Sequence, residues 1–280
     1  VDRGYVKGAK LNQAKPYRTV VQFGHSGAIS RGVLSPGGSL VFSGGMDEQL
    51  KLWDLSTGLE VRALDSPGSP VHSVDVSPDA SMALSAADDG TVRRWDLFTG
   101  LEEDRHSGHQ GPISTVRYLD GDSTFLTASW DKTLRLWSVG NSKAEGVMKG
   151  HEAAVLACAY SHESDMIFSG DSDGILLAWE SGDEKPLAKH QAHSGAVRSL
   201  ASHGDNDMFA SGGEDGKIRL WKAERFKAGR TIVAHEGSVT ALAFSPDGST
   251  LASGGKDRSI KLWNVADGRE LKRLDGHEQF

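Results

Sequence analysis

Residues 235–264, HEGSVTALAFSPDGSTLASGGKDRSIKLWN, contain the unit from which most of the chain is built. The β-branched and apolar run Val239–Phe244 suits a strand. Ser245-Pro246-Asp247-Gly248 has the composition of a tight turn, because proline presets φ and glycine tolerates a positive φ. Thr250–Ser253 and Ile260–Trp263 suit two further strands, with a polar turn between them. The stretch therefore predicts a three-stranded antiparallel meander.

Four residue types recur with a period of 42 residues through six copies of this unit. The tryptophans are Trp53, Trp95, Trp137, Trp179, Trp221 and Trp263; the aspartates six residues earlier are Asp47, Asp89, Asp131, Asp173, Asp215 and Asp257. The hydroxyl residues are Ser43, Ser85, Thr127, Ser169, Ser211 and Ser253; the histidines are His25, His109, His151, His193 and His235, with Pro67 in the second copy. A period in the forties with four strands per unit indicates a β-propeller rather than a helical solenoid.

Short motifs at fixed places in the repeat carry a family resemblance. The Gly24-His25 and Gly108-His109 pairs, the Ser-Pro-Asp turns and the Trp53-Asp54 and Trp95-Asp96 ends resemble the WD-repeat β-propeller family, and the style of the repeats is similar to that of bacterial WD-repeat proteins. The resemblance covers roughly residues 17–277. It implies an all-β propeller of four-stranded antiparallel blades.

Counting strands predicts the domain organisation. We expect residues 1–16 to be a linker or tail and residues 17–280 to form the propeller, with an incomplete last blade. Residues 17–23 suit an outer strand that has no inner strands to join, and Gly276-His277-Glu278 opens a seventh unit. The simplest account is six complete repeats plus parts of a seventh, as in a truncated seven-blade ring. A closed six-blade ring is the alternative, and the start at Val1 rather than Met suggests a fragment.

The recurring hydroxyl, histidine and aspartate could be read as catalytic triads. Five equivalent nucleophiles, each with a tryptophan at the same spacing, would serve no enzyme. We interpret them as structural tetrads in which Trp donates to the hydroxyl, the hydroxyl donates to one His nitrogen, and the other His nitrogen donates to Asp. The family resemblance implies the same role. In the second copy Ser85 and Asp89 lack this histidine, and His72 comes five residues too late to replace it.

Composition restricts the classes of partner. The chain has 31 basic and 38 acidic residues and a net charge of −7, which argues against a broad nucleic-acid or anionic-membrane surface. No apolar run is long enough to span a membrane. The single cysteine, Cys158, falls on a core position of the repeat, which favours a buried hydrophobe over a reactive thiol. We expect protein or peptide partners, no nucleic acid, no membrane, and a cytoplasmic location.

Motifs for cofactors and metals are weak. His106-x-x-His109 and His190-x-x-His193 could suggest metal ligation, but His109 and His193 are already assigned to tetrads and no further ligand is close in sequence. No phosphate-binding glycine loop or haem motif is present. We therefore expect no cofactor and no metal.

The resemblance implies a place for partners, because WD-repeat proteins often meet them at the narrow top rim of the ring. The positions implied at this rim are Met46, His72, Asp88, Trp130, Asp171, Arg198, Glu214 and Lys256. Trp130 is the only tryptophan off the repeat period, and an exposed tryptophan among charged groups suits a binding hot spot. A tryptophan lying flat over a neighbouring loop is the alternative.

Uniform spacing favours a non-catalytic role. Every interval between successive repeat tryptophans is 42 residues, so no blade carries a long inserted loop of the kind that builds active sites. The favoured hypothesis is a WD-repeat scaffold that mediates protein–protein interaction through the rim. The alternative is a sensory or docking propeller within a larger multidomain bacterial protein, for example beside a protein kinase, protease or cytochrome segment. A hydrolase that uses one tetrad is disfavoured.

Overall fold

The computed structural model describes residues 24–65, 68–119, 121–203 and 207–276. These residues form 24 strands in six four-stranded antiparallel sheets, and the predicted all-β fold is confirmed. Nowhere in the described ranges is there a helix long and apolar enough to cross a membrane. The predictions for residues 1–16, for the strand at 17–23 and for His277 and Glu278 lie outside these ranges.

Each sheet consists of four strands that are consecutive in the chain and pair in that order. The first three sheets contain β1 (Ile29–Leu34), β2 (Leu40–Gly45), β3 (Gln49–Asp54) and β4 (Leu59–Asp65); β5 (Val71–Val76), β6 (Met82–Ala87), β7 (Thr91–Asp96) and β8 (Glu102–Ser107); β9 (Ile113–Tyr118), β10 (Thr124–Ser129), β11 (Thr133–Ser138) and β12 (Gly146–Lys149). The last three contain β13 (Val155–Ser161), β14 (Met166–Asp171), β15 (Ile175–Glu180) and β16 (Ala188–Gln191); β17 (Val197–His203), β18 (Met208–Gly213), β19 (Lys217–Lys222) and β20 (Lys227–Val233); β21 (Val239–Phe244), β22 (Thr250–Gly255), β23 (Ser259–Asn264) and β24 (Glu270–Asp275).

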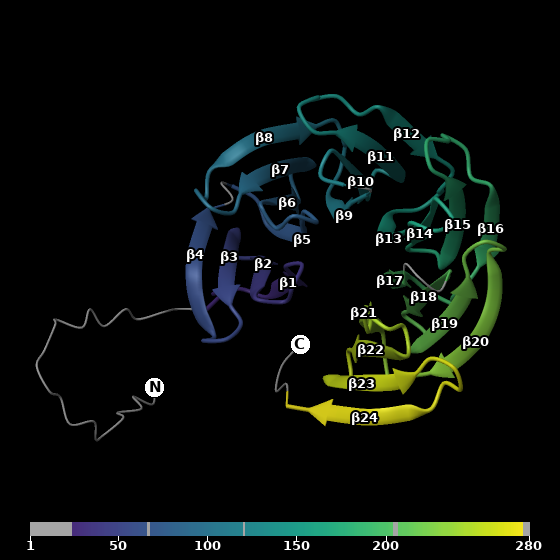
Figure 1. Cartoon of the computed structure of the whole chain (residues 1–280). Coiled ribbons are helices and arrows are strands. Elements are labelled where there is room, and N and C mark those ends of the chain that lie inside the picture. The colour runs from purple at the N-terminus through teal and green to yellow at the C-terminus, as the bar shows by residue number, and fades with distance from the viewer. Residues whose placement is uncertain (1–23, 66–67, 120, 204–206, 277–280) are drawn as a thin grey trace, which may run out of the picture.

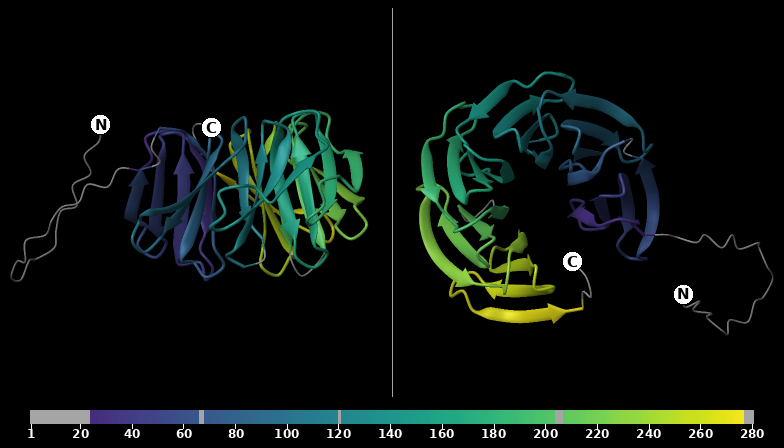
Figure 2. Two further views of the ribbon diagram at one scale, coloured as in Figure 1. Left: turned by 90° about the horizontal axis from the view of Figure 1, so that it is seen from above. Right: turned by 180° about the vertical axis from the view of Figure 1, so that it is seen from behind.

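The six sheets are the blades of a propeller. Their first strands surround a central axis and their fourth strands form the outer edge (Figure 1). Neighbouring blades meet along their inner strands, with β1 against β5 and so on around the ring to β17 against β21. Seen edge-on, the strands of the blades run between the two faces of the ring, roughly along its axis (Figure 2). Radial packing of this kind leaves the inner strand ends free to build a common site at the axis.

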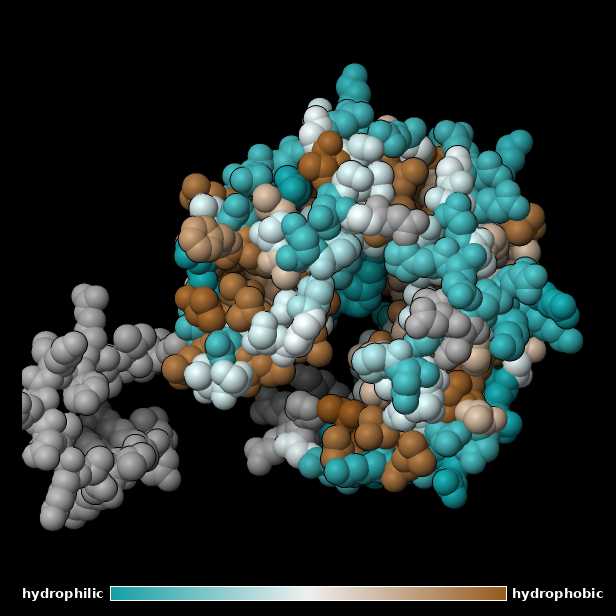
Figure 3. Space-filling model, in the orientation of Figure 1, coloured by the Kyte–Doolittle hydropathy of each residue, from teal (hydrophilic) through white to brown (hydrophobic). Residues whose placement is uncertain are grey.

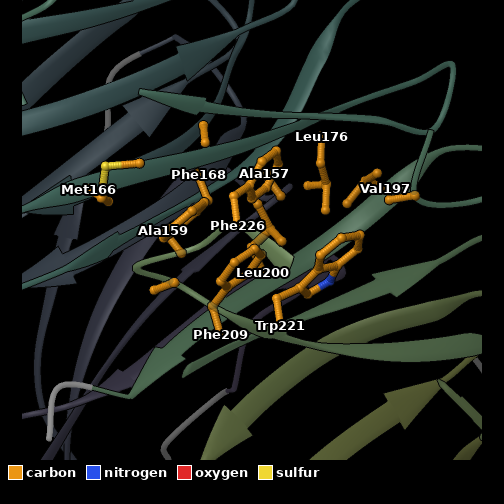
Figure 4. Packing of buried hydrophobic residues seen from close by; sticks show 13 residues of the cluster. Ala157, Ala159, Met166, Phe168, Leu176, Val197, Leu200, Phe209, Trp221 and Phe226 are labelled. Carbon is orange, nitrogen blue, oxygen red and sulfur yellow. The ribbon is translucent and has the colours of Figure 1, made fainter. Parts of the chain in front are cut away.

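Apolar residues fill the spaces between blades. In the interface between the β13–β16 and β17–β20 blades, Phe168 stacks on Phe209 with ring centroids 3.9 Å apart, and Phe209 stacks on Trp221 at 5.7 Å (Figure 4). All three side chains are buried. Burying apolar area stabilises by roughly 25 cal/mol per Å², so these interfaces are the main source of stability.

In five of the six blades, a branched residue at the start of the first strand packs against the preceding blade. These five residues are fully buried at 0% exposure: Val71, Ile113, Val155, Val197 and Val239. They lie against small residues of the second strand of the preceding blade. A Cβ added to Gly170 would lie 2.4 Å from Val197, and one added to Gly212 would lie 2.7 Å from Val239. Glycine is used here because the neighbouring side chain approaches the backbone so closely.

Among the residues that the structure describes, the ring is open between the first and last blades. Ile29 occupies the same repeat position as the five buried residues but is 59% exposed. At the other end, only the Cβ of Ala241, at 3.6 Å, would meet a Cβ added to Gly254. An opening separates β1–β4 from β21–β24 in Figures 1 and 2. The closed six-blade alternative is therefore wrong, whereas the truncated seven-blade ring stays a prediction.

Candidate functional site

A β-bulge in every first strand points one side chain toward the axis. The pairing of the first and second strands skips one residue in each blade, for example between Val71 and Ser73 and between Val197 and Ser199. The skipped residues are Ser30, His72, Ser114, Leu156, Arg198 and Thr240. All six line one cavity at the centre of the ring. Bulges commonly re-aim a side chain, and here they build a ring of unlike side chains around a channel.

One side of this ring joins three of the residues expected at the rim. His72 Nε2 lies 2.9 Å from Asp88 Oδ1. The imidazole of His72 is 6.1 Å from the Trp130 ring at an interplanar angle of 33°. The Trp130 backbone N–H donates to the Pro112 carbonyl at 2.9 Å, which fixes the turn after β10. Trp130 remains 49% exposed, so it rests beside the neighbouring blade and also presents a face to solvent.

A second group brings together the charged rim residues. Arg198 lies 3.4 Å from Glu214, which also accepts the Ala196 backbone N–H at 3.3 Å. This backbone hydrogen bond and the Arg198 charge hold the pKa of Glu214 below its usual value, and the charge of Lys256 adds to the effect. Arg198 and Lys256 both line the central cavity with His72. Met46 is exposed on the turn after β2, with no role assigned by its contacts.

The fourth blade corrects two of the predicted positions. Asp171, expected at the rim, is 2% exposed and its Oδ2 lies 2.7 Å from His151 Nδ1. Asp173, expected in the tetrad, instead donates its backbone N–H to Asp171 Oδ1 at 3.0 Å. The reason is that residue 171 is the last residue of β14, beside the His151 ring. The other blades have a small residue there, and in Gly213 an added Cβ would collide with the His193 ring. In the fourth blade the Asp171 carboxylate fills that space and accepts the hydrogen bond of His151 in place of Asp173.

Hydrogen-bonded side chains join the strands in five blades. The Trp Nε1–H donates to the hydroxyl at 2.8–2.9 Å, the hydroxyl lies 2.7–2.8 Å from His Nε2, and His Nδ1 lies 2.7–2.9 Å from the carboxylate. The five sets are His25, Ser43, Asp47 and Trp53; His109, Thr127, Asp131 and Trp137; His151, Ser169, Asp171 and Trp179; His193, Ser211, Asp215 and Trp221; His235, Ser253, Asp257 and Trp263. All five hydroxyl residues are buried. A hydroxyl so placed is occupied by indole and imidazole and is shielded from any substrate.

Burial and hydrogen bonding set the protonation of these groups. Burial lowers the pKa of His109, and the hydrogen bond that His109 donates to Asp131 offsets only part of this effect. Burial alone would raise the pKa of Asp131, but hydrogen bonds from His109, Thr133 and the Gln110 backbone outweigh it and hold the pKa far below the usual range. A neutral histidine beside an ionised carboxylate is the state that these shifts favour.

The second blade uses a different arrangement. Trp95 Nε1–H still donates to Ser85 Oγ at 2.9 Å. Asp89 binds the Arg93 guanidinium at 2.8 Å and accepts the Thr91 hydroxyl at 2.7 Å. Pro67, which replaces the histidine in sequence, lies outside the described residues. The carboxylate of this blade is thus paired with an arginine of its own sheet.

The two other histidines considered for metal binding have different roles. His106 Nδ1 lies 2.9 Å from the Asn141 carbonyl oxygen, and its ring packs edge-on to Phe125. The His190 ring packs against Trp221 and Phe226. Across the part of the chain that the structure describes, no three His, Cys, Asp or Glu side chains gather closely enough to hold a metal ion.

Two charged residues near the axis were missed from the sequence. Arg31 lines the central cavity, and Asp75 accepts the Tyr118 backbone N–H at 2.8 Å and pairs with Arg117 at 3.4 Å. Burial raises the pKa of Asp75 to about 6. Both positions break the repeat pattern, since the equivalents of Arg31 are Ser73, Thr115, Ala157, Ser199 and Ala241. That departure is the signal that could have identified them. Cys158 is buried, as expected, and burial raises its pKa to about 12.

Comparison with known proteins identifies the family. The family model described as "WD domain, G-beta repeat" matches residues 15–54, 58–96, 102–138, 142–180, 184–222 and 226–264. The chain is also 45% identical over 51 residues to the small ribosomal subunit protein RACK1 of Medicago sativa, a stretch that is 18% of this chain and 15% of that protein. The chain therefore matches only a small part of that relative's length. With six matched repeats that span most of the sequence and six four-stranded blades around one axis, the chain belongs to the WD-repeat β-propeller family.

Proposed function

We propose that the protein is a non-catalytic scaffold that binds a protein or peptide partner at the channel-side rim formed by His72, Asp88, Trp130, Arg198, Glu214 and Lys256. A protein-interaction role is typical of WD-repeat propellers, and the short match to RACK1, itself a ribosomal subunit protein, is consistent with it. Binding at this rim and the absence of catalysis are the two parts of this role that we propose for the chain.

The observation that carries the proposal is the environment of Trp130. Its indole is half exposed, its backbone is fixed by Pro112, and His72 lies beside its ring. A large rigid side chain that is held in place before binding loses little conformational entropy when a partner covers it. Tryptophan and arginine are the residue types that dominate binding energies at protein interfaces. Arg198, paired with Glu214 nearby, would orient the partner.

A peptide library tests the proposal with a matched control. The immobilised chain is used to select random 12-residue peptides displayed on phage, and the best peptides are then measured by titration. Trp130→Ala is expected to weaken binding about tenfold or more, because truncation of a hot-spot residue costs about 2 kcal/mol or more. Phe98→Ala is the control, because Phe98 is 88% exposed in the turn between β7 and β8. The β7–β8 turn lies on the opposite face of the ring from the β10–β11 turn, which carries Trp130 in the next blade.

Equal affinity of the Trp130→Ala variant and the parent would remove Trp130 from the site. Equal losses from both variants would show that exposed aromatic residues act unspecifically. The alternative of a docking propeller within a larger multidomain protein stays a prediction, and it would use the same rim.

A further inference from the structure

The central cavity is large enough to hold a ligand or a short peptide segment. Its volume is about 770 Å³; residues from all six blades line it, and it extends over the open face of the last blade, where Ala252, Gly254 and Ile260 line it. Ligand pockets commonly enclose about 300–1,000 Å³. Figure 3 shows the same hollow at the centre of the ring face, with hydrophilic residues in its depth and hydrophobic residues on the blade beside the opening. The cavity is therefore a candidate site in its own right.

The charge of the lining is opposite to that of the whole protein. Arg31, Arg198, Lys256 and Arg258 line the cavity, and none of its described lining residues is Asp or Glu. The chain as a whole has seven more acidic than basic residues, 38 against 31. A concave region lined by one sign of charge concentrates ligands of the opposite sign. The cavity is thus a cationic recess in an acidic molecule.

Arg31 is the cation with unmet hydrogen-bonding capacity. Its Nε is buried and has no hydrogen-bond partner in the structure. Asp75 is the nearby opposite charge that acts on Arg31, but it already pairs with Arg117 and accepts the Tyr118 N–H. A guanidinium has five N–H donors and stays charged even when burial lowers its pKa. Buried donors without acceptors are unfavourable, so this position favours an incoming anion.

The surroundings of Arg31 decide which anion fits best. Ile29, Leu156, Leu200 and Ile260 also line the cavity, so apolar side chains accompany Arg31 there. At the mouth, Arg198 is already paired with Glu214. A compact polyphosphate needs several convergent unpaired cations, and a nucleic acid would approach an acidic surface. A protein segment with apolar side chains and one carboxylate that enters the cavity matches both the apolar lining and the Arg31 guanidinium.

We propose that the central cavity receives an acidic, partly apolar segment of the protein partner, with one Asp or Glu carboxylate bound in bidentate fashion by the Arg31 guanidinium. This inference rests on the proposed function, since the same partner would continue from the rim into the channel. It names the chemistry of that partner. Arginine is suited to this role because its planar fork matches the two oxygens of a carboxylate.

The peptide library described above tests the inference when the selected sequences are compared. Peptides selected on the parent chain should be enriched in Asp or Glu next to apolar residues. For a synthetic peptide of the selected sequence, Arg31→Met should raise Kd tenfold or more, and Arg31→Lys should raise it less. Arg105→Met is the matched control, because Arg105 is exposed on β8 and pairs with Glu102 away from the cavity. Unchanged melting temperatures show that each variant is folded.

A double-mutant cycle assigns the contact. When the acidic residue of the peptide is replaced by its amide, Arg31→Met should have little further effect. Enrichment of Lys, Arg or uncharged peptides, or equal affinity of the Arg31→Met variant for the acidic peptide, would overturn the inference. Arg31-dependent binding of sodium tripolyphosphate, without any acidic peptide, would overturn it in favour of a small anion. Failure here with Trp130-dependent binding intact would leave the proposed rim function standing, whereas loss of both would refute both.

Discussion

The closed interface between the β13–β16 and β17–β20 blades and the open faces of the first and last blades use the same repeat positions with opposite outcomes. Val197 is completely buried against Gly170, whereas its equivalent Ile29 is 59% exposed. Gly254, the equivalent of Gly170, has no branched residue packed on it. Each repeat therefore carries one branched residue and one small residue that can receive it. The neighbour in the ring decides whether either contributes to stability.

The largest contrast should come from the branched residue itself. Val197→Ala is expected to lower the free energy of unfolding by about 2–3 kcal/mol, because it removes buried methyl groups and leaves a cavity. Ile29→Ala should change it by less than about 0.5 kcal/mol, as for most exposed positions. Urea unfolding of the two variants measures the difference. Similar losses in both would show that Ile29 is covered in solution.

The receiving residue gives the complementary test. Gly170→Ala should destabilise by about 1–3 kcal/mol, because its Cβ would lie 2.4 Å from Val197. Gly254→Ala should be neutral or slightly stabilising, since the nearest atom is the Ala241 Cβ at 3.6 Å and alanine loses less backbone entropy on folding. Melting temperatures by calorimetry provide the comparison. A destabilising Gly254→Ala change would mean that something packs on this face.

A third comparison lies within one blade at the closed interface. Asp171→Ala should lower stability by about 1–3 kcal/mol, because it leaves the buried His151 Nδ1 without an acceptor. Asp173→Ala, two residues away and exposed, should cost less than about 0.5 kcal/mol. Asp215→Ala, in the next blade, is expected to match Asp171→Ala because Asp215 holds His193 in the same way. A larger loss for Asp173→Ala than for Asp171→Ala would reinstate Asp173 in the tetrad.

Lowering the pH should destabilise the closed interface and the last blade alike. Near neutral pH this is the smallest of the expected effects. Burial lowers the pKa of both His193, at the closed interface, and His235, in the last blade. The unfolded histidines, with an ordinary pKa of about 6.5, bind protons more readily, so stability should fall as the pH drops below about 6.5. The lowered pKa values of Asp215 and Asp257 add a further loss below about pH 4.

Unfolding midpoints in urea between pH 8 and pH 3.5 would show this decline. Stability that rises as the pH falls from 7.5 to 5.5 would contradict the assignment of neutral folded histidines. Hydrogen exchange read blade by blade would show whether the last blade responds to acid as the closed ones do.

The repeat pattern predicted most of the fold, because the residues that define each blade lie within one repeat of 42 residues. The spacing of indole, hydroxyl, histidine and aspartate predicted the strands, the turns and which side chains meet inside a blade. It was wrong for Asp171 and Asp173, because the Asp171 side chain fills space that a small residue leaves open in the other blades, and its carboxylate accepts the hydrogen bond of His151. The pattern also did not identify Arg31, because the cavity that Arg31 lines is formed by strands from six separate blades.

The sequence by itself determined the blade, because strand propensity, turn chemistry and the tetrads all act within about forty residues. Only the tertiary structure decided that the bulges point six unlike side chains toward one axis, that Ile29 lies exposed on an open blade face, and that Arg31 faces a cavity with no Asp or Glu among its described lining residues. The physical reason is that burial and the net charge of a site are properties of contacts between blades. A single repeat specifies the residues that each blade brings to such a contact, and the arrangement around the axis specifies which of them meet.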